Sequence, residues 1–331
     1  MRILLFFYLL LIGLFVGYVY NYQTTDSIER EWSENELTGN MDETYVMVTF
    51  QVGIDYWKRS LKGFEDAAEA MNVSVEYRGA TQYDVDEEIT VLEQVIAKNP
   101  AGIAVSTMDP RALNPVIENA VDAGIPVVMF DSDAPESEAY SFLGTDNYNA
   151  GVEAANKMAE LLNEEGEVGV ITQPHQLNHQ ERTQGFQDTI FVEYPNMKVV
   201  SIKDGRGEQM LSKAAAEDIM REYPDIAGIF ATEANGGVGV GLATVANNRQ
   251  DLIKIISFDT GKGTLDMIED GVISATLAQG TWEMGYWSLQ FLFHLQHDIV
   301  EQENDSMPLP RFVDTGVTIV TKENVDSYYP Q

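Results

Sequence analysis

The sequence predicts an α/β fold: two doubly wound parallel-sheet lobes joined by a hinge and preceded by an N-terminal transmembrane helix. Three observations support this prediction. The chain has 331 residues, which is too long for one ordinary core and suits two lobes. Short β-branched runs alternate with helical patterns, and this alternation occurs twice. The chain also opens with an almost unbroken apolar stretch, at residues 3–20.

The apolar opening favours a retained membrane anchor over a cleaved signal peptide. The stretch is long enough to span the hydrocarbon, and no small-x-small cleavage site follows it. Tyr18, Tyr20 and Tyr22 suit a membrane interface, and Arg2 ahead of the stretch places the rest of the chain outside. We therefore expect a transmembrane anchor or signal segment at 1–22, an acidic linker at 23–44, and a location on the extracytoplasmic face of the cell membrane.

The first half of the chain yields four strands and three helices in strict alternation. The strands are expected at 46–50, 73–77, 102–106 and 126–130, and the helices at 56–71, 86–97 and 111–123. The strands are apolar without polar alternation, as burial on both faces of a parallel sheet requires.

The second half repeats this scheme. Strands are expected at 168–172, 199–202, 227–231, 255–258 and 274–278, and helices at 182–193, 210–222, 236–246, 263–269 and 287–296. Ligands of doubly wound sheets bind beyond the carboxyl ends of the strands, so two facing lobes predict a cleft lined by the residues that follow each strand.

Composition excludes several classes of protein. The chain carries 53 Asp plus Glu against 20 Lys plus Arg, a formal charge of −33, which opposes binding to nucleic acid. It has no cysteine, which removes disulfides, thiolate metal sites, Cys nucleophiles and a lipidated Cys anchor.

The side chains near the expected strand ends suit a sugar. Vicinal hydroxyls match the paired oxygens of an Asp and the fork of an Arg, and the C–H face of a sugar ring packs on aromatic rings. An amide can donate and accept at once. The candidate residues of this kind are Tyr56, Trp57, Asp131, Arg182, Asp259 and Gln279.

From residue 46 to the C-terminus the chain resembles the type 1 periplasmic binding proteins, in particular the ribose-binding-like sugar receptors of ABC transporters. The motifs that carry the resemblance are Tyr56-Trp57 with Gly63, Ala123-Gly-Ile-Pro-Val127 before Phe130-Asp131, Gly144-Thr-Asp-Asn147 with Gly151, Arg182-Thr-Gln-Gly-Phe186, Ile256-Ser-Phe-Asp259, Ala275-Thr-Leu-Ala-Gln279 and Val320-Thr-Lys-Glu-Asn324.

The resemblance implies roles for these residues. Tyr56 and Trp57 would stack on the sugar, and its hydroxyls would be held by the polar set Asp131, Arg182, Asp259 and Gln279. Hinge crossings are implied near 143–145, 279–280 and 314–316, which gives an N-terminal lobe of 45–144 plus 281–314 and a C-terminal lobe of 145–280 plus 315–331.

Three features depart from the family pattern. Ser132 stands where the ribose receptor has an Arg, and Glu233 stands at the amide-bearing position, with Asn235 two residues later. No aromatic occurs near Asp204-Gly205-Arg206, where some members have a second stacking residue. We keep Glu233 and Asn235 among the ligand-binding candidates, and these departures put ribose itself in doubt as the ligand.

Motifs that suggest catalysis have simpler explanations. Two Asp-Thr-Gly runs, at 259–261 and 314–316, lie among α/β units rather than in the all-β fold of an aspartic protease. His175 and His179 lack the Glu of a zinc protease motif, so a polar loop near the cleft is expected there. The glycines of 237–241 lie within a predicted helix and suggest close packing. No catalytic residue, metal or cofactor is predicted.

The expected function is an extracytoplasmic sugar-binding receptor, the substrate-binding component of an ABC-type carbohydrate uptake system, with a monosaccharide or small oligosaccharide held between two closing lobes. Its partner would be an ABC permease in the membrane. The alternative is a membrane-anchored sugar sensor that signals to a histidine kinase or chemoreceptor. A sugar-responsive DNA-binding repressor is dismissed, because it would need a helix-turn-helix and a basic face.

Overall fold

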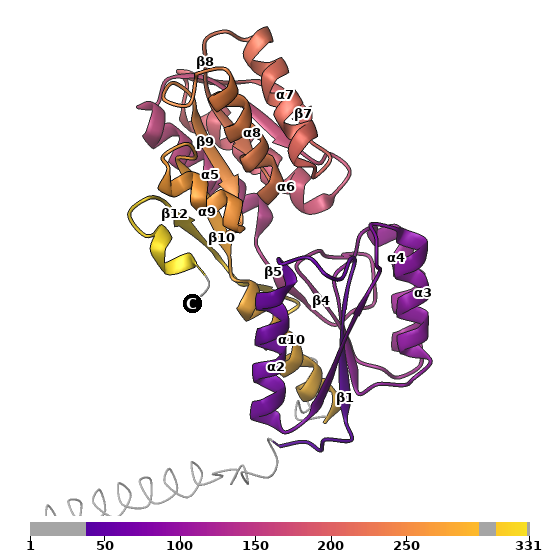
Figure 1. The fold of residues 1–331 in the computed structure, drawn as a ribbon. Coiled ribbons are helices and arrows are strands. Elements are labelled where there is room, and N and C mark those ends of the chain that lie inside the picture. Colours follow the sequence, from indigo (N-terminus) through magenta and orange to yellow (C-terminus); the bar gives the residue numbers. More distant parts are fainter. Residues whose placement is uncertain (1–37, 298–308, 330–331) are drawn as a thin grey trace, which may run out of the picture.

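Two six-stranded sheets, each the centre of one α/β lobe, organise the chain (Figure 1). The computed structural model describes residues 38–297 and 309–329. The first sheet has the order β11-β5-β4-β3-β1-β2 and the second the order β12-β10-β9-β8-β6-β7. All pairings are parallel except that of β10 with β12. The predicted two-lobed α/β architecture is confirmed.

Within the described residues, the first lobe contains six strands and four helices. Its strands are β1 (Thr44–Thr49), β2 (Ser74–Gly79), β3 (Gly102–Val105), β4 (Val127–Phe130), β5 (Phe142–Gly144) and β11 (Phe312–Asp314). Its helices are α2 (Trp57–Met71), α3 (Val85–Ile96), α4 (Pro110–Asp122) and α10 (Thr281–Gln296).

The second lobe has six strands of its own. They are β6 (Gly166–Thr172), β7 (Met197–Asp204), β8 (Ile226–Ala231), β9 (Lys254–Phe258), β10 (Ala275–Gln279) and β12 (Val317–Val320). Its helices are α5 (Asn147–Leu162), α6 (Leu177–Glu193), α7 (Gln209–Glu222), α8 (Ala234–Ala246), α9 (Lys262–Glu269) and the short 3₁₀ helix η1 (Val325–Tyr328).

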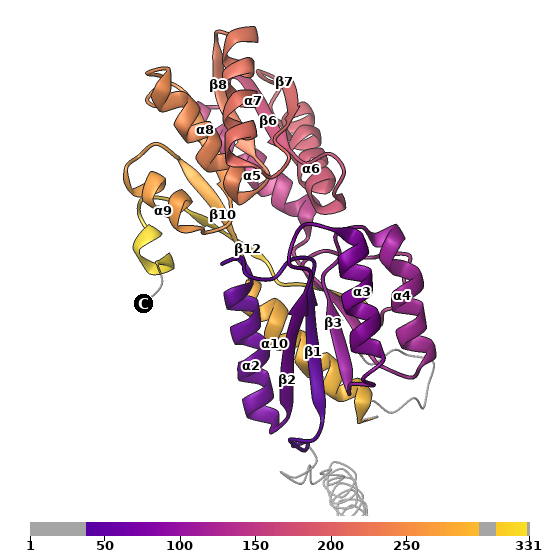
Figure 2. The same cartoon turned by 45° about the vertical axis from the view of Figure 1, so that its right-hand side comes forward.

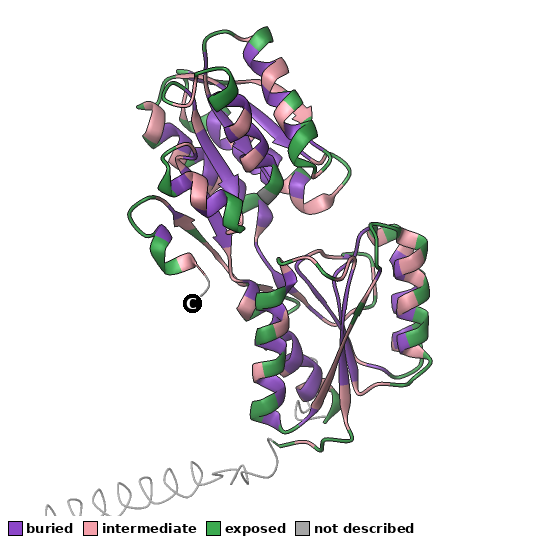
Figure 3. Cartoon of the chain, in the orientation of Figure 1, coloured by how far each residue is buried: buried purple, intermediate pink, exposed green. Residues whose placement is uncertain are grey.

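Burial follows the alternation of elements. The central strands β3 and β4 are buried at every residue, as parallel strands covered on both faces must be. The helices bury one side and expose the other, which Figure 3 shows as purple and green stripes. Each lobe therefore has its own core on either face of its sheet.

Glycines allow pairs of helices to approach closely in both lobes. A Cβ on Gly285 of α10 would lie 1.8 Å from the carbonyl oxygen of Ser60 on α2, and one on Gly151 of α5 would lie 2.1 Å from that of Arg182 on α6. The predicted close packing of residues 237–241 is also confirmed, since a Cβ on Gly237 would lie 1.9 Å from Ser257 Oγ.

The chain passes between the lobes three times, and these crossings lie together (Figures 1 and 2). They join β5 to α5, β10 to α10, and β11 to β12. The second and third each contain a glycine that the backbone requires, for different reasons: a Cβ on Gly280 would lie 2.3 Å from the carbonyl oxygen of Thr315, and Gly316 has a left-handed φ of +75°. These three crossings lie where the hinge was expected, at 143–145, 279–280 and 314–316, and motion about them stays a prediction.

Four elements differ from the expected set. Helix α5 and the strands β5, β11 and β12 were not predicted; these strands have only three or four residues and show no periodicity. Helix α6 begins at Leu177, so His179 lies on a helix and not in the expected loop.

The expected anchor at 1–22 lies outside the described residues, as does most of the expected linker at 23–44. Within the described ranges, no helix combines the length and apolar character needed to cross a membrane.

One buried carboxyl beneath the first lobe's strand-end loops makes stability depend on pH. Glu88 of α3 is 0% exposed, its Oε2 accepts the Met108 N–H at 3.1 Å, and its Oε1 has no hydrogen-bond partner among the described residues. Burial, with a contribution from the charge of Asp109, raises the pKa of Glu88 from 4.5 to about 8.

We expect wild-type stability to fall between about pH 4.5 and about pH 8, because the folded state keeps a proton on Glu88 that the unfolded state has lost. A shift of one pKa unit corresponds to roughly 1.4 kcal/mol, so Glu88 contributes a few kcal/mol at most to this fall in the free energy of unfolding. Glu88→Gln cannot lose that proton and should show a smaller fall in urea unfolding across this window. The control is Glu93→Gln, on the exposed face of the same helix. Identical pH profiles for Glu88→Gln and wild type would contradict the assignment.

Candidate functional site

A cavity of about 430 Å³ lies between the two lobes, at the loops that follow the strands. Both lobes contribute side chains to it. The predicted residues that line it are Tyr56, Asp131, Arg182, Glu233, Asn235, Asp259 and Gln279. The structure therefore brings together seven of the eight candidates, although they are spread over more than 200 positions of the sequence.

Two aspartates occupy equivalent positions, one in each lobe. Asp131 follows β4 and Asp259 follows β9, and both have left-handed backbones, with φ of +61° and +64°. For a residue with a side chain this conformation costs of order 1 kcal/mol or more, and such strain concentrates at functional sites. The turn that ends each strand thus places a carboxylate at the cavity.

The carboxylate of Asp131 is held by its own lobe. Its Oδ1 accepts a hydrogen bond from the Tyr56 hydroxyl, and its Oδ2 accepts one from Ser106 Oγ at 3.2 Å. Burial raises the pKa of Asp131 to about 6, against the opposing effects of Tyr56 and Arg182. The two hydrogen bonds fix the orientation of the Asp131 carboxyl.

Arg182 is the buried cation of the second lobe. It is 2% exposed, and its guanidinium carbon lies 3.6 Å from the centre of the Phe258 ring. Its Nε donates to Asn147 Oδ1 at 2.8 Å, its Nη1 to the carbonyl of Thr232 at 2.9 Å, and its Nη2 to Gln279 Oε1 at 3.1 Å. Burial lowers the pKa of Arg182, whereas the carboxylate of Asp259 acts to raise it. These bonds engage three of the five N–H groups of Arg182, which is also one of the residues that line the cavity.

Gln279, at the end of β10, makes hydrogen bonds to residues of both lobes and to a residue beside the first crossing. Its Oε1 accepts from Arg182 and also from Thr145 Oγ1 at 2.8 Å, next to the first crossing. Its Nε2 donates to Asp259 Oδ1 at 2.7 Å and to the Tyr56 hydroxyl at 3.0 Å. A continuous network therefore runs from Asp131 through Tyr56 and Gln279 to Arg182 and crosses from one lobe to the other.

Glu233 and Asn235 form the cavity wall at the start of α8. Glu233 caps this helix: its Oε2 accepts the backbone N–H of Asn235 at 2.8 Å, and burial raises the pKa of Glu233 to about 7. Asn235 is exposed and donates from Nδ2 to the carbonyl of Gly207 at 3.0 Å. Glu233 therefore has a structural role as a helix cap as well as a place at the cavity.

Trp57 is the predicted residue that the cavity does not include. It is 1% exposed and lies in the core of the first lobe, with ring-centre distances of 5.1 Å to Phe50, 4.8 Å to Tyr56 and 5.7 Å to Phe130. As the first residue of α2 it turns inward, whereas the neighbouring Tyr56 borders the cavity. Trp57 therefore contacts the neighbouring Tyr56 from within the core, and its stacking on a ligand stays a prediction.

Several further residues line the cavity that were not predicted as ligand contacts, because they lie in loops or in the first turn of α6, ahead of its expected start. Among them are His179, Tyr83, Gln173, Gln176, Arg206 and Glu208, of which His179 was expected near the cleft but in a loop. His179 Nδ1 lies 3.1 Å from Thr232 Oγ1, and burial holds the pKa of His179 well below its usual range, so the ring is neutral. Only their positions after β2, β6 and β7 could have indicated them, by the same strand-end rule.

Comparison with known proteins decides the family. A family profile described as "Periplasmic binding protein domain" matches residues 45–297. This chain belongs to that family.

Solved structures of similar proteins agree. A sugar ABC transporter (sugar-binding protein) from Bacillus halodurans is 64% identical, with 87% of this chain and 100% of that chain covered and a TM-score of 0.84. AraP, an arabinose binding protein from Geobacillus stearothermophilus, is 62% identical, with 87% and 99% covered and a TM-score of 0.82. A chain of the XylFII-LytSN complex is 25% identical, with 85% and 98% covered and a TM-score of 0.75. The resemblance inferred from the sequence motifs is confirmed.

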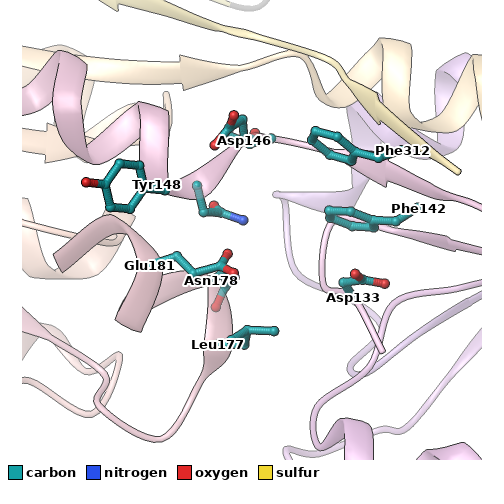
Figure 4. Close-up of a pocket in the computed structure, with 10 residues that line it drawn as sticks. Asp133, Phe142, Asp146, Tyr148, Leu177, Asn178, Glu181 and Phe312 are labelled. Carbon is teal, nitrogen blue, oxygen red and sulfur yellow. The ribbon is translucent and has the colours of Figure 1, made fainter. Parts of the chain in front are cut away.

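This periplasmic binding protein has a second, smaller hollow beside the main cavity, of about 250 Å³ (Figure 4). Phe142 and Phe312 of the first lobe stack there at 5.7 Å, and Asp146 and Glu181 lie on the opposite side. Burial, together with the nearby charges of Asp133 and Asp146, raises the pKa of Glu181. This hollow is lined by carboxylates without a guanidinium, so it lacks the mixed donors and acceptors of the main cavity. No group of acidic or His side chains suited to a metal occurs in the described ranges.

Proposed function

We propose that this chain is the substrate-binding component of an ABC-type carbohydrate uptake system and that it holds an aldopentose ring between its lobes. It is a receptor and not an enzyme. The observation that carries the proposal is the hydrogen-bonded network from Asp131 through Tyr56 and Gln279 to Arg182, because it surrounds one cavity with residues of both lobes. A ligand held at this network would link the lobes and favour the closed arrangement.

The chemistry of the network suits a neutral sugar. The two remaining N–H groups of Arg182 would donate to neighbouring hydroxyls, and the carboxylates of Asp131 and Asp259 would accept from others. The ring of Tyr56 offers an aromatic surface for the C–H face of the sugar. A sugar acid would bring a further negative charge toward the two aspartates, so neutral sugars are preferred.

The pentose assignment rests on similarity. AraP is described as an arabinose binding protein, and it is 62% identical over 99% of its length. The departures at Ser132 and Glu233 separate this chain from the ribose receptor pattern. We therefore infer that arabinose or a closely related pentose occupies the cavity.

The partner is a membrane protein that distinguishes the closed receptor from the open one. The uptake system implies an ABC permease. A sensor protein is the second candidate, favoured by the XylFII-LytSN complex, in which a chain of this fold is assembled with another protein. We also propose that residues 1–22 anchor the receptor in the membrane, since they are apolar and no cleavage site follows them.

Calorimetry against L-arabinose, D-xylose and D-ribose should show saturable binding of at least one pentose. Asp131→Asn should weaken that binding by about 10- to 100-fold, because a neutral amide replaces a charged hydrogen-bond acceptor. Asp122→Asn, an exposed carboxylate at the end of α4, is the matched control and should bind as wild type does. The absence of binding to any neutral sugar by folded wild type would refute the proposed function. Unchanged affinity in Asp131→Asn would refute its site.

Fractionation of native cells tests the anchor. We expect the full-length protein in the membrane fraction, resistant to salt and alkaline washing and released by detergent, because an apolar span is held by the bilayer and not by charge. N-terminal sequencing that finds a mature chain starting after residue 22 would contradict the anchor and leave the sugar site untouched.

A further inference from the structure

The cavity has two chemically similar halves that differ in burial. The inner half is the network already described. The outer half lies toward solvent and is formed by Phe50, Tyr83, Gln173, Arg206 and Glu208. The inner residues Asp131 and Arg182 are 5% and 2% exposed, whereas Tyr83 in the outer half is 54% exposed. The inner half therefore encloses its ligand, and the outer half borders the entrance.

Tyr83 is a fixed aromatic platform at this entrance. Its ring packs edge-on against Phe50, with centres 5.9 Å apart and planes at 79°. Its hydroxyl also accepts a hydrogen bond from Gln176 Nε2, which belongs to the other lobe. The ring is thus held at two points while more than half of the residue stays accessible. An exposed aromatic ring with a fixed orientation is suited to stacking on a sugar.

The second lobe provides polar groups to the outer half. Arg206 and Gly207 both have left-handed backbones, with φ of +54° and +66°, so the loop after β7 turns sharply at the cavity. The Arg206 side chain is 73% exposed, and its Nε forms an ion pair with the carboxylate of Asp204 at 3.9 Å. Glu208 and Gln173 add an acceptor and an amide beside it. This half therefore also contains a guanidinium, a carboxylate and an amide.

We propose that the outer half is a second sugar subsite, so that the receptor takes a pentose joined by a glycosidic bond to a second sugar. This inference rests on the proposed function, because the first ring must occupy the inner half. The two halves offer the same combination of aromatic face, guanidinium, carboxylate and amide within one continuous cavity of about 430 Å³. The second sugar stacks on Tyr83 of the first lobe and hydrogen-bonds to Arg206 of the second.

Calorimetry with L-arabinose and with its α-1,5-linked disaccharide, repeated with D-xylose and xylobiose, tests the subsite. The readout is the ratio of the Kd of the monosaccharide to the Kd of the disaccharide. We expect a ratio of about 10 in wild type for at least one pair, the gain that one aromatic stacking contact provides.

Tyr83→Ala should lower the ratio to about 1. Tyr83→Phe keeps the ring and should keep the ratio, even if loss of the hydrogen bond to Gln176 weakens both ligands. Phe191→Ala, at a residue 86% exposed on α6 and outside the cavity, is the control and should behave as wild type.

The outcomes separate this inference from the proposed function. A wild-type ratio of about 1 or below for both pairs, with the pentose bound, overturns the second subsite and leaves the pentose receptor intact. A high ratio that Tyr83→Ala does not lower also overturns the subsite as assigned. Failure of every pentose and disaccharide to bind overturns the proposed function and the inference with it.

Discussion

The geometry of the site depends on the groups that satisfy the charge and the hydrogen bonds of one buried cation, Arg182. Arg182 is almost fully enclosed, and a guanidinium in such surroundings is stable only if its hydrogen bonds and charge are satisfied. Asn147, the carbonyl of Thr232, the amide of Gln279 and the ring of Phe258 supply the direct contacts, and Asp259 and Asp131 supply the opposite charge. The residues that stabilise Arg182 come from several elements, so holding this cation also fixes the geometry of the cavity.

Gln279 connects Arg182 by hydrogen bonds to the first lobe and to the segments that join the lobes. It is the last residue of β10, next to the second hinge crossing, and it accepts a hydrogen bond from Thr145 beside the first. The same amide contacts Asp259 in its own lobe and Tyr56 in the other. A ligand that competes for these partners would therefore act directly on the segments that join the lobes. The described geometry gives a physical route from occupancy of the cavity to motion about the hinge.

The two-lobed fold and several residues of the candidate site could be predicted from the sequence. Parallel strands are apolar runs, and the polar residue after each run lies at the same edge of the sheet, so Asp131, Asp259 and Gln279 were identifiable without coordinates. The sequence does not show which of two adjacent aromatics turns toward the core, so the burial of Trp57 beside the cavity-lining Tyr56 could not be predicted. Tyr83 and Arg206 were missed because their positions depend on loop conformations, and Arg206 in particular on a left-handed turn that no periodic pattern encodes. Strands as short as β5 and β11 escaped for a related reason, since three residues carry no period.

The central claim is that a sugar bound between the lobes draws them together. The chain has no native cysteine, so two can be introduced without interference, Glu118→Cys on α4 and Met210→Cys on α7, one on each lobe. Spin labels at these sites report the distance between the lobes by pulsed electron paramagnetic resonance. Saturating L-arabinose, or whichever pentose calorimetry shows to bind, should shift the distance distribution to shorter values and narrow it. A distribution that stays the same with the sugar demonstrably bound would contradict closure about the hinge.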